Sequence, residues 1–220
     1  MSIPTHSGKT TATRAFTVTE LLITIACIAV LAAIFLPALA KSKARSSRIG
    51  CANNLKQIGL AFRTWSLDNN DHFPTQVSVT NGGTMELVAS GVVYRHFQVM
   101  SNELSTPKIL LCPNDEKRSY ATNFAVDLSD RNVSYFLNVD GSTGNGSSLL
   151  SGDRNITNKV PAGGRLVSLT KADTIAWTKE LHSEKGHLGF GDGRVDSFSN
   201  ETAGAALKVS DATTNWLAVP

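Results

Sequence analysis

The sequence predicts an α+β protein in which one long N-terminal helix packs on an antiparallel β-sheet. Two observations lead to this prediction. An apolar run over residues 16–40 continues into an amphipathic helical pattern that stops near residue 68, where Asp-Asn-Asn-Asp follows. After residue 72 the pattern changes to short β-type runs separated by turn residues. We therefore expect a helical stalk over residues 41–70 and a β-rich globular domain over residues 71–220, built around one core.

The apolar run contains twenty-five residues and a single charged side chain, Glu20. As an α-helix it would measure about 37 Å, which exceeds the roughly 30 Å hydrocarbon core of a bilayer. We expect a single membrane-spanning helix over residues 16–40. A carboxylate inside such a segment costs about 2–3 kcal/mol unless it has a partner. Glu20 is therefore a candidate functional residue.

A second interpretation of the same segment stays open. Residues 38–40 read Ala-Leu-Ala, which is the small-residue spacing that signal peptidase cuts. Cleavage after Ala40 would release a soluble secreted binding protein. A third possibility, a membrane-anchored hydrolase of the cell envelope, has no recognisable catalytic motif in its favour. We expect no enzyme activity, no cofactor and no catalytic residue.

The composition limits the partners that the chain can have. Its 220 residues are 41% hydrophobic and 18% charged, which excludes a disordered chain. The chain has 21 basic and 18 acidic residues, and residues 1–15 hold two of the basic ones and no acid, so the remainder carries a charge of only +1. A nucleic-acid-binding domain is usually more basic, and we expect no nucleic-acid partner. Four basic residues lie between Lys41 and Arg48, directly after the apolar run, where lipid headgroups would be their neighbours.

The globular part is expected to contain short strands. Residues 141–152 hold four Gly and four Ser and predict a mobile loop. Asp192-Gly193 lies between two alternating runs and predicts a tight hairpin turn, with Gly193 at positive φ. The predicted strands are Val92–Met100, Lys108–Cys112, Val133–Asn138, Arg165–Leu169, Thr174–Thr178, His187–Phe190 and Arg194–Phe198.

The start of the apolar run resembles the processing site of type IV pilins and type II secretion pseudopilins. Residues 14–22 read RAFTVTELL, in which a basic leader is followed by a small residue, by Phe and by Glu four residues after the Phe. The resemblance implies that prepilin peptidase removes residues 1–15, cuts between Ala15 and Phe16, and methylates the new amine of Phe16. Ala15 stands where the family usually has Gly.

This resemblance also implies location, partners and function. The protein would be a single-pass protein of the bacterial inner membrane with an exported, periplasmic domain, although the basic residues counted alone would place that domain in the cytoplasm. Its partners would be prepilin peptidase, copies of itself and other pilin-like subunits of a pilus or secretion filament. There the Phe16 amine of one subunit would pair with Glu20 of a neighbour at low dielectric, which offsets the desolvation of both charges and sets the register.

The second half of the chain resembles a large group of pseudopilin-like proteins. Residues 182–195 read HSEKGHLGFGDGRV, which matches the group's signature of a histidine, nine residues and Asp-Gly. Segments at Cys51–Ala61, Leu111–Asp115 and Ser134–Asn138 also resemble this group.

The signature residues have a structural and a chemical interpretation. In the structural one, His182 hydrogen-bonds across the hairpin whose turn is Asp192-Gly193. In the chemical one, His182, His187 and Asp192 bind zinc, but the sequence shows no clear further ligands. We expect the structural function and no metal.

Cys51 and Cys112 are expected to form a disulfide, since an exported domain lies in an oxidising compartment. Cys51 shares one helical face with Leu55 and Phe62 and so points at the domain. Cys112 ends an apolar run that we expect to be a strand against that face. The bond would close a loop of about 60 residues, which corresponds to about 4 kcal/mol of stabilisation. The alternative is two separate buried thiols; Cys27 is expected to remain a thiol in either case.

Overall fold

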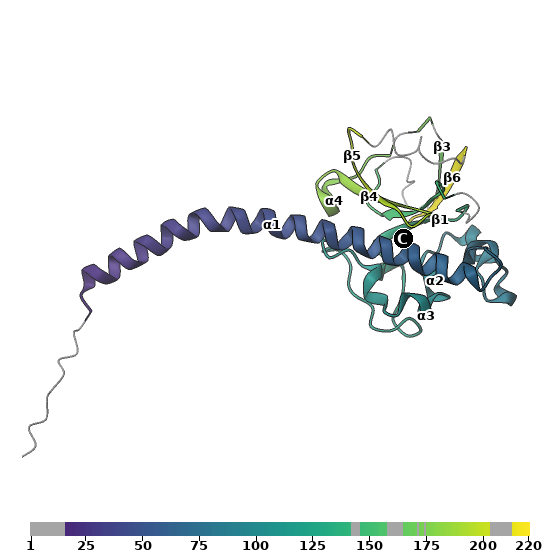
Figure 1. Ribbon diagram of the computed structural model, residues 1–220, viewed down its shortest axis with the longest axis horizontal. Helices are drawn as coiled ribbons and strands as arrows, with labels where there is room; N and C mark the ends of the chain where they lie inside the picture. The colour runs from purple at the N-terminus through teal and green to yellow at the C-terminus, as the bar shows by residue number, and fades with distance from the viewer. Residues whose placement is uncertain (1–15, 142–145, 158–164, 171, 174, 203–212) are drawn as a thin grey trace, which may run out of the picture. The chain divides into compact units, whose positions relative to one another are not determined.

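The computed structural model describes residues 16–141, 146–157, 165–170, 172–173, 175–202 and 213–220. The predicted leader, residues 1–15, lies outside the described residues. The chain forms two compact units, Met1–Lys43 and Ala44–Pro220. Helix α1, Val18–Leu67, belongs to both, and an antiparallel sheet lies in the second (Figure 1). The expected α+β class with a long N-terminal helix is confirmed.

Helix α1 has two physically different halves. Its buried residues all come after residue 50 and recur at helical spacing, so they form one face of the helix. The helix ends at Leu67, and Asn70 and Asp71 follow in the left-handed region, with φ of 53° and 58°. The buried residues are Cys51, Leu55, Ile58, Gly59, Ala61, Phe62, Trp65 and Ser66.

Short helices, and no strands, fill the described chain between α1 and the sheet. The predicted strands Val92–Met100 and Lys108–Cys112 are wrong. In the first, Val93, Phe97 and Met100 are buried at spacings of four and three residues, which suits a helix that packs on α1. In the second, Pro107 begins a 3₁₀ turn, and the Thr106 hydroxyl accepts a hydrogen bond from the Lys108 amide. The α-helices are α2 (Tyr94–Gln98) and α3 (Ser101–Leu104); the 3₁₀ helices are η1 (Pro74–Gln76), η2 (Val79–Asn81), η3 (Met85–Ser90), η4 (Pro107–Leu110) and η5 (Asp130–Asn132).

The described strands form one sheet in the order β3-β6-β1-β2-β4-β5, and every neighbouring pair is antiparallel. Strand β1 alternates between two cores: Tyr135 and Leu137 join the core that contains the α1 face, and Phe136 joins a second core with Trp177 and Leu188. Figure 1 shows the sheet and the short helices α2 and α3 on opposite sides of the second half of α1. The strands are β1 (Tyr135–Asn138), β2 (Leu149–Asp153), β3 (Leu166–Thr170), β4 (Lys185–Phe190), β5 (Val195–Ser199) and β6 (Thr214–Ala218), and helix α4 is Lys179–His182.

Four of the seven predicted strands correspond to β1, β3, β4 and β5. In the predicted strand Thr174–Thr178, residues 175–178 form no strand, although Trp177 makes an isolated bridge with Ile156. The prediction of a mobile loop over residues 141–152 is wrong for residues 149–152, because they belong to the fully buried strand β2, Leu149–Asp153. A Cβ atom on Gly152 would come within 2.7 Å of side-chain atoms of Phe136 and Leu188, so the small residue there permits close packing. Residues 142–145 lie outside the described chain.

Candidate functional site

The predicted processing and assembly residues lie at the beginning of α1. Phe16 is 73% exposed, and Ala15 lies outside the described residues. The Glu20 carboxylate accepts hydrogen bonds from the Thr17 backbone amide at 2.9 Å and from the Thr17 hydroxyl at 2.7 Å. This reciprocal contact satisfies an amide that the first helical turn leaves without a partner. A cut before Phe16 would keep the contact, because both residues follow the cut.

The first half of α1 presents apolar side chains to its surroundings. Its large hydrophobic residues from Phe16 to Leu39 are between 52% and 76% exposed. Within the described chain, α1 is the helix that is long and apolar enough to cross a membrane, and none of its most apolar window is buried. By its length and composition, this helix could form a single membrane span.

The predicted disulfide between Cys51 and Cys112 is present. Their Cα atoms are 5.1 Å apart, and both residues are fully buried. The element that carries Cys112 differs from the prediction, since this residue follows the 3₁₀ helix η4 and lies in no strand. The Asn54 amide donates to the Leu111 carbonyl at 3.0 Å and helps to hold that segment on α1. Cys27 is an exposed free thiol.

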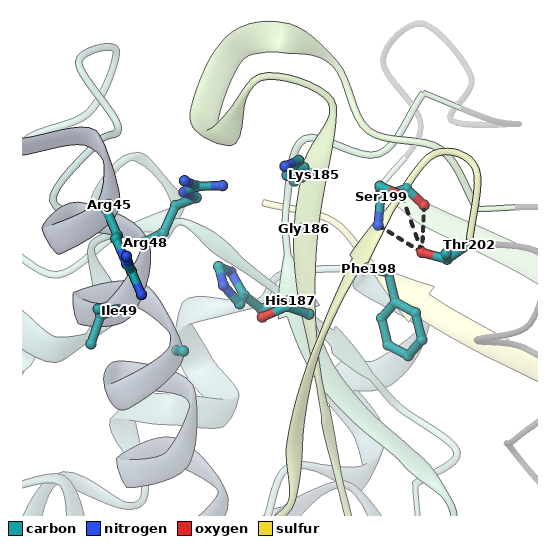
Figure 2. Close-up of a pocket in the computed structure, with 11 residues that line it drawn as sticks. Arg45, Arg48, Ile49, Lys185, Gly186, His187, Phe198, Ser199 and Thr202 are labelled. Carbon is teal, nitrogen blue, oxygen red and sulfur yellow. Dashed lines mark hydrogen bonds between the residues drawn. The ribbon is translucent and has the colours of Figure 1, made fainter. Parts of the chain in front are cut away.

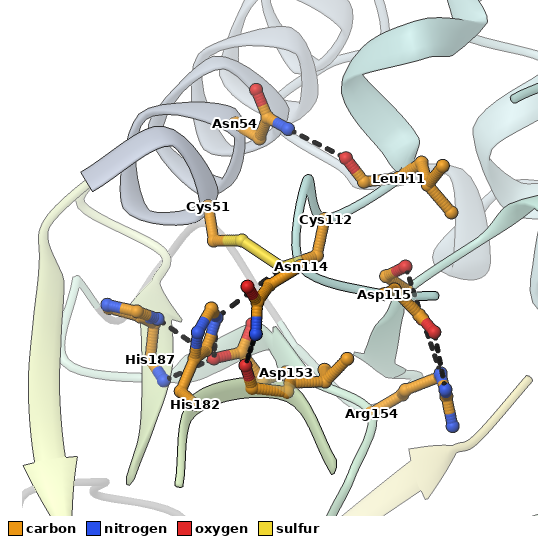
Figure 3. Close-up of a disulfide and its surroundings, with 12 residues drawn as sticks. Cys51, Asn54, Leu111, Cys112, Asn114, Asp115, Asp153, Arg154, His182 and His187 are labelled. Atoms are coloured by element: carbon orange, nitrogen blue, oxygen red, sulfur yellow. Dashed lines mark hydrogen bonds and ion pairs between the residues drawn. A yellow bond between two sulfur atoms is a disulfide. The ribbon is translucent and has the colours of Figure 1, made fainter. Parts of the chain in front are cut away.

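His182 lies beside this disulfide (Figure 3). Its Nε2 atom is 3.4 Å from the Cys112 Sγ and 3.7 Å from a carboxylate oxygen of Asp153, which ends β2. The expected hydrogen bond of His182 across the hairpin is therefore corrected: helix α4 directs the side chain to α1. Burial lowers the pKa of His182 and outweighs the opposing charge of Asp153; His187 and Arg48 lower this pKa further.

His187 and Asp153 complete a buried cluster with His182. One Asp153 oxygen accepts hydrogen bonds from the His187 backbone amide and contacts its Nδ1, both at 2.8 Å. The two imidazole rings meet edge to face, with their centroids 5.1 Å apart. The other Asp153 oxygen and the His182 Nδ1 are buried and have no hydrogen-bond partner among the described residues. Sequence reasoning missed Asp153, because it lies about thirty residues before the histidines and directly follows a segment predicted to be a loop.

Asp192 and Gly193 form the turn that the sequence predicts. Gly193 has a φ of 86°, and β4 pairs with β5 on either side of the turn. The Asp192 carboxylate accepts from the Arg194 amide at 2.8 Å, and its backbone carbonyl accepts from the Arg63 guanidinium at 2.8 Å. The Arg63 bond attaches the turn to α1. The structure therefore brings His182 together with His187 and leaves Asp192 in the turn.

The buried cluster offers three atoms that suit a metal ion. One ligand atom each of Asp153, His182 and His187 lie within 4.8 Å of one another. Cys51 and Cys112 are next to His182 but are oxidised in the disulfide, so they offer no thiolate. A hydrogen bond between Asp153 and His187 already engages two of these three residues. The positive charge of Arg48 lies near the third, His182, and would repel a cation. We therefore keep the expectation that no metal binds.

We expect the purified protein to contain no stoichiometric zinc after incubation with zinc and dialysis, since the Asp153–His187 hydrogen bond and the nearby charge of Arg48 oppose the binding of a cation. Metal analysis by mass spectrometry of wild type and of His187→Ala should give the same background content. One tightly bound zinc equivalent in the wild type, absent from His187→Ala and Asp153→Asn, would reverse this assignment.

A second buried polar group was not predicted from the sequence. The Asp115 carboxylate accepts two hydrogen bonds from Arg154 at 2.8 Å each and one from the Ser134 hydroxyl at 2.7 Å. Arg154 also binds Glu180. Burial by itself would raise the pKa of Asp115, but the hydrogen bonds from Arg154 and Ser134 outweigh it and lower the pKa. The pairing joins β2, α4 and the segment after the disulfide.

Comparison with known proteins assigns no family to this chain. No family model, no curated protein and no solved structure matches it. The function must therefore be argued from the sequence motifs and from the geometry described above.

Proposed function

We propose that this protein is a structural, pilin-like subunit of a type II secretion or type IV pilus-like filament. Prepilin peptidase would process it, its first helix would anchor it in the bacterial inner membrane, and residues 44–220 would form the periplasmic domain. The observation that carries this proposal is the combination found in α1. An exposed apolar half bears Glu20 four residues after Phe16, and the second half of the same helix contributes a buried face to an α+β domain.

The exposed half of α1 supports a function in assembly. A surface of this size would lie in lipid before assembly and against the equivalent helices of neighbouring subunits afterwards. The Phe16 amine created by cleavage would then pair with Glu20 of a neighbouring subunit. Since an unpaired charge in such a place is costly, this pairing would select one register.

The polar groups of the domain support a structural function over catalysis. Arg154 binds both Asp115 and Glu180, the disulfide joins α1 to the segment after η4, and His182 of α4 contacts this disulfide. These contacts stiffen the junction between the helix and the domain, which is where a filament subunit would transmit load.

The mature N-terminus tests this proposal against the alternative of a soluble secreted protein. Intact-mass measurement and N-terminal sequencing of membrane-extracted protein should find Phe16 first, with its amine methylated. A mature chain that begins at Lys41 would show signal-peptidase cleavage and would contradict the pilin-like function.

We predict that Glu20→Gln leaves the cut before Phe16 intact and lowers filament assembly at least about tenfold. The neutral amide removes the charged partner of the amine, and one order of magnitude corresponds to only about 1.4 kcal/mol. Assembly would be measured as sheared filament or as secretion in cells. Thr24→Ala is the matched control, because it removes a polar group from the same segment without changing charge. Normal assembly of Glu20→Gln would exclude the proposed pairing.

A further inference from the structure

A cavity of about 450 Å³ opens between the α1 face just after residue 44 and the β4–β5 hairpin (Figure 2). Its walls come from α1, from both strands of the hairpin and from the residues after β5. Figure 2 shows Arg45 and Arg48 on α1, across from Lys185 and His187 on β4. The polar side chains that line it are Arg45, Arg48, Lys185, His187, Ser197, Ser199 and Thr202.

The charged side chains that line this cavity are all positive. Arg45, Arg48 and Lys185 line it, and none of its described lining residues is an acid. In the described chain these three side chains make no hydrogen bond or ion pair with protein. Other arginines of the domain do have acidic partners: Arg154 binds Asp115, and Arg194 binds Asp196 at 2.6 Å. Three unpaired cations around one cavity repel one another, and a bound anion would remove that repulsion.

A second, smaller cavity shares two of these cations. It has a volume of about 330 Å³ and is lined by Arg48 and Lys185 together with Asn114, His182 and Ser183. The His182 side chain is only 1% exposed, and its Nδ1 has no partner among the described residues. Arg48 and Lys185 therefore line both cavities, and each cavity also has neutral polar residues in its lining.

We propose that this pair of cavities binds the phosphate group of an anionic phospholipid, with Arg48 and Lys185 as the central contacts. Guanidinium groups match the oxygen geometry of phosphate, the ammonium group adds a compact charge, and the hydroxyls of Ser197 and Ser183 supply neutral donors. The choice of a lipid rests on the proposed function. Arg45 and Arg48 follow the end of the apolar segment by only five and eight residues, which is headgroup depth if that segment spans the membrane.

The test uses the full-length chain, purified in neutral detergent and titrated with phosphatidylglycerol or phosphatidylcholine. Bound lipid is counted by native mass spectrometry. We expect the wild type to bind phosphatidylglycerol at least about tenfold more tightly than phosphatidylcholine. The double variant Arg48→Gln/Lys185→Gln should lose this preference. The matched control, Lys56→Gln/Lys108→Gln, removes the same charge from exposed positions outside both cavities and should keep it.

Two further measurements make each outcome decisive. Peptide mapping of the Cys51–Cys112 bond checks that each variant is folded, and glycerol phosphate is titrated as a soluble competitor. Equal binding of both lipids, or a preference that survives the double variant, would overturn the lipid site. Glycerol phosphate that binds as tightly as phosphatidylglycerol would overturn the lipid assignment and identify a soluble phosphate ester. A mature chain that begins at Phe16 but shows no lipid preference would refute this inference alone, whereas one that begins at Lys41 would refute the proposed function.

Discussion

Replacing both Cys51 and Cys112 by alanine is expected to lower the free energy of unfolding by about 2–5 kcal/mol. The bond closes a chain segment of 61 residues and joins α1 to the segment that leads into the sheet. Without it, the unfolded chain regains the conformational freedom that the closed loop removes. Urea unfolding, followed through the buried Trp65 and Trp177, measures the loss.

Cys27→Ala provides the matched control for the disulfide, because Cys27 is exposed and unbonded. It should leave the unfolding midpoint unchanged. Reduction of the wild type should reproduce the loss seen in the double variant. An unchanged midpoint in the double variant would mean that the bond adds nothing to the docking of α1.

Asp115→Asn is expected to destabilise the domain by about 3–5 kcal/mol. The Asp115 carboxylate is fully buried, and Arg154, whose side chain is 12% exposed, would lose its bidentate partner. Glu180 stays beside Arg154, but the substitution removes the fully buried acid of this network and so unbalances its buried charges, which costs more than the pair itself contributes. Asp196→Asn is the control, since its pair with Arg194 is over one-third exposed on both sides, and such pairs contribute at most about 1 kcal/mol.

The Asp115 contribution should depend on pH with a definite sign. Because the pKa of Asp115 is lowered in the folded state, the stabilisation is complete above the pKa of the unfolded chain, about 3.9. It is lost as the pH falls through the lower, folded-state value. The difference in unfolding free energy between wild type and Asp115→Asn should therefore be constant near neutral pH and shrink below about pH 4. If this difference in unfolding free energy already falls between pH 7 and pH 5, the titrating group is not Asp115.

Elements with a local or periodic signal could be predicted from the sequence. The apolar run and the one-sided pattern around Cys51 and Phe62 predict a long helix, because every fourth or third side chain shares a face. Asp192-Gly193 predicts its turn because Gly adopts positive φ without strain. The short helix around Phe97 was missed, although its buried residues follow helical spacing, because β-branched and aromatic residues there also suit a strand.

Strand β2 and the buried polar clusters could not be predicted in this way. The glycines and serines of residues 141–152 suggest a loop, and only the neighbouring Phe136 and Leu188 explain why the small Gly152 belongs in the centre of the sheet. Asp115 and Arg154 are 39 residues apart, and Asp153 meets His187 across 34 residues. No local pattern encodes such pairings, since they exist only when separate elements are brought into contact.

By itself, the sequence determined the apolar helix, its charged residue Glu20 and the α+β class. These properties depend on composition and on spacing along one element, which the chain carries whether or not it is folded. The tertiary structure decided that His182 contacts the disulfide in place of the hairpin, and that Arg48 and Lys185 face one cavity. Both outcomes depend on how α1, α4 and β4 pack, because burial and charge neighbours are set by elements far apart in the sequence.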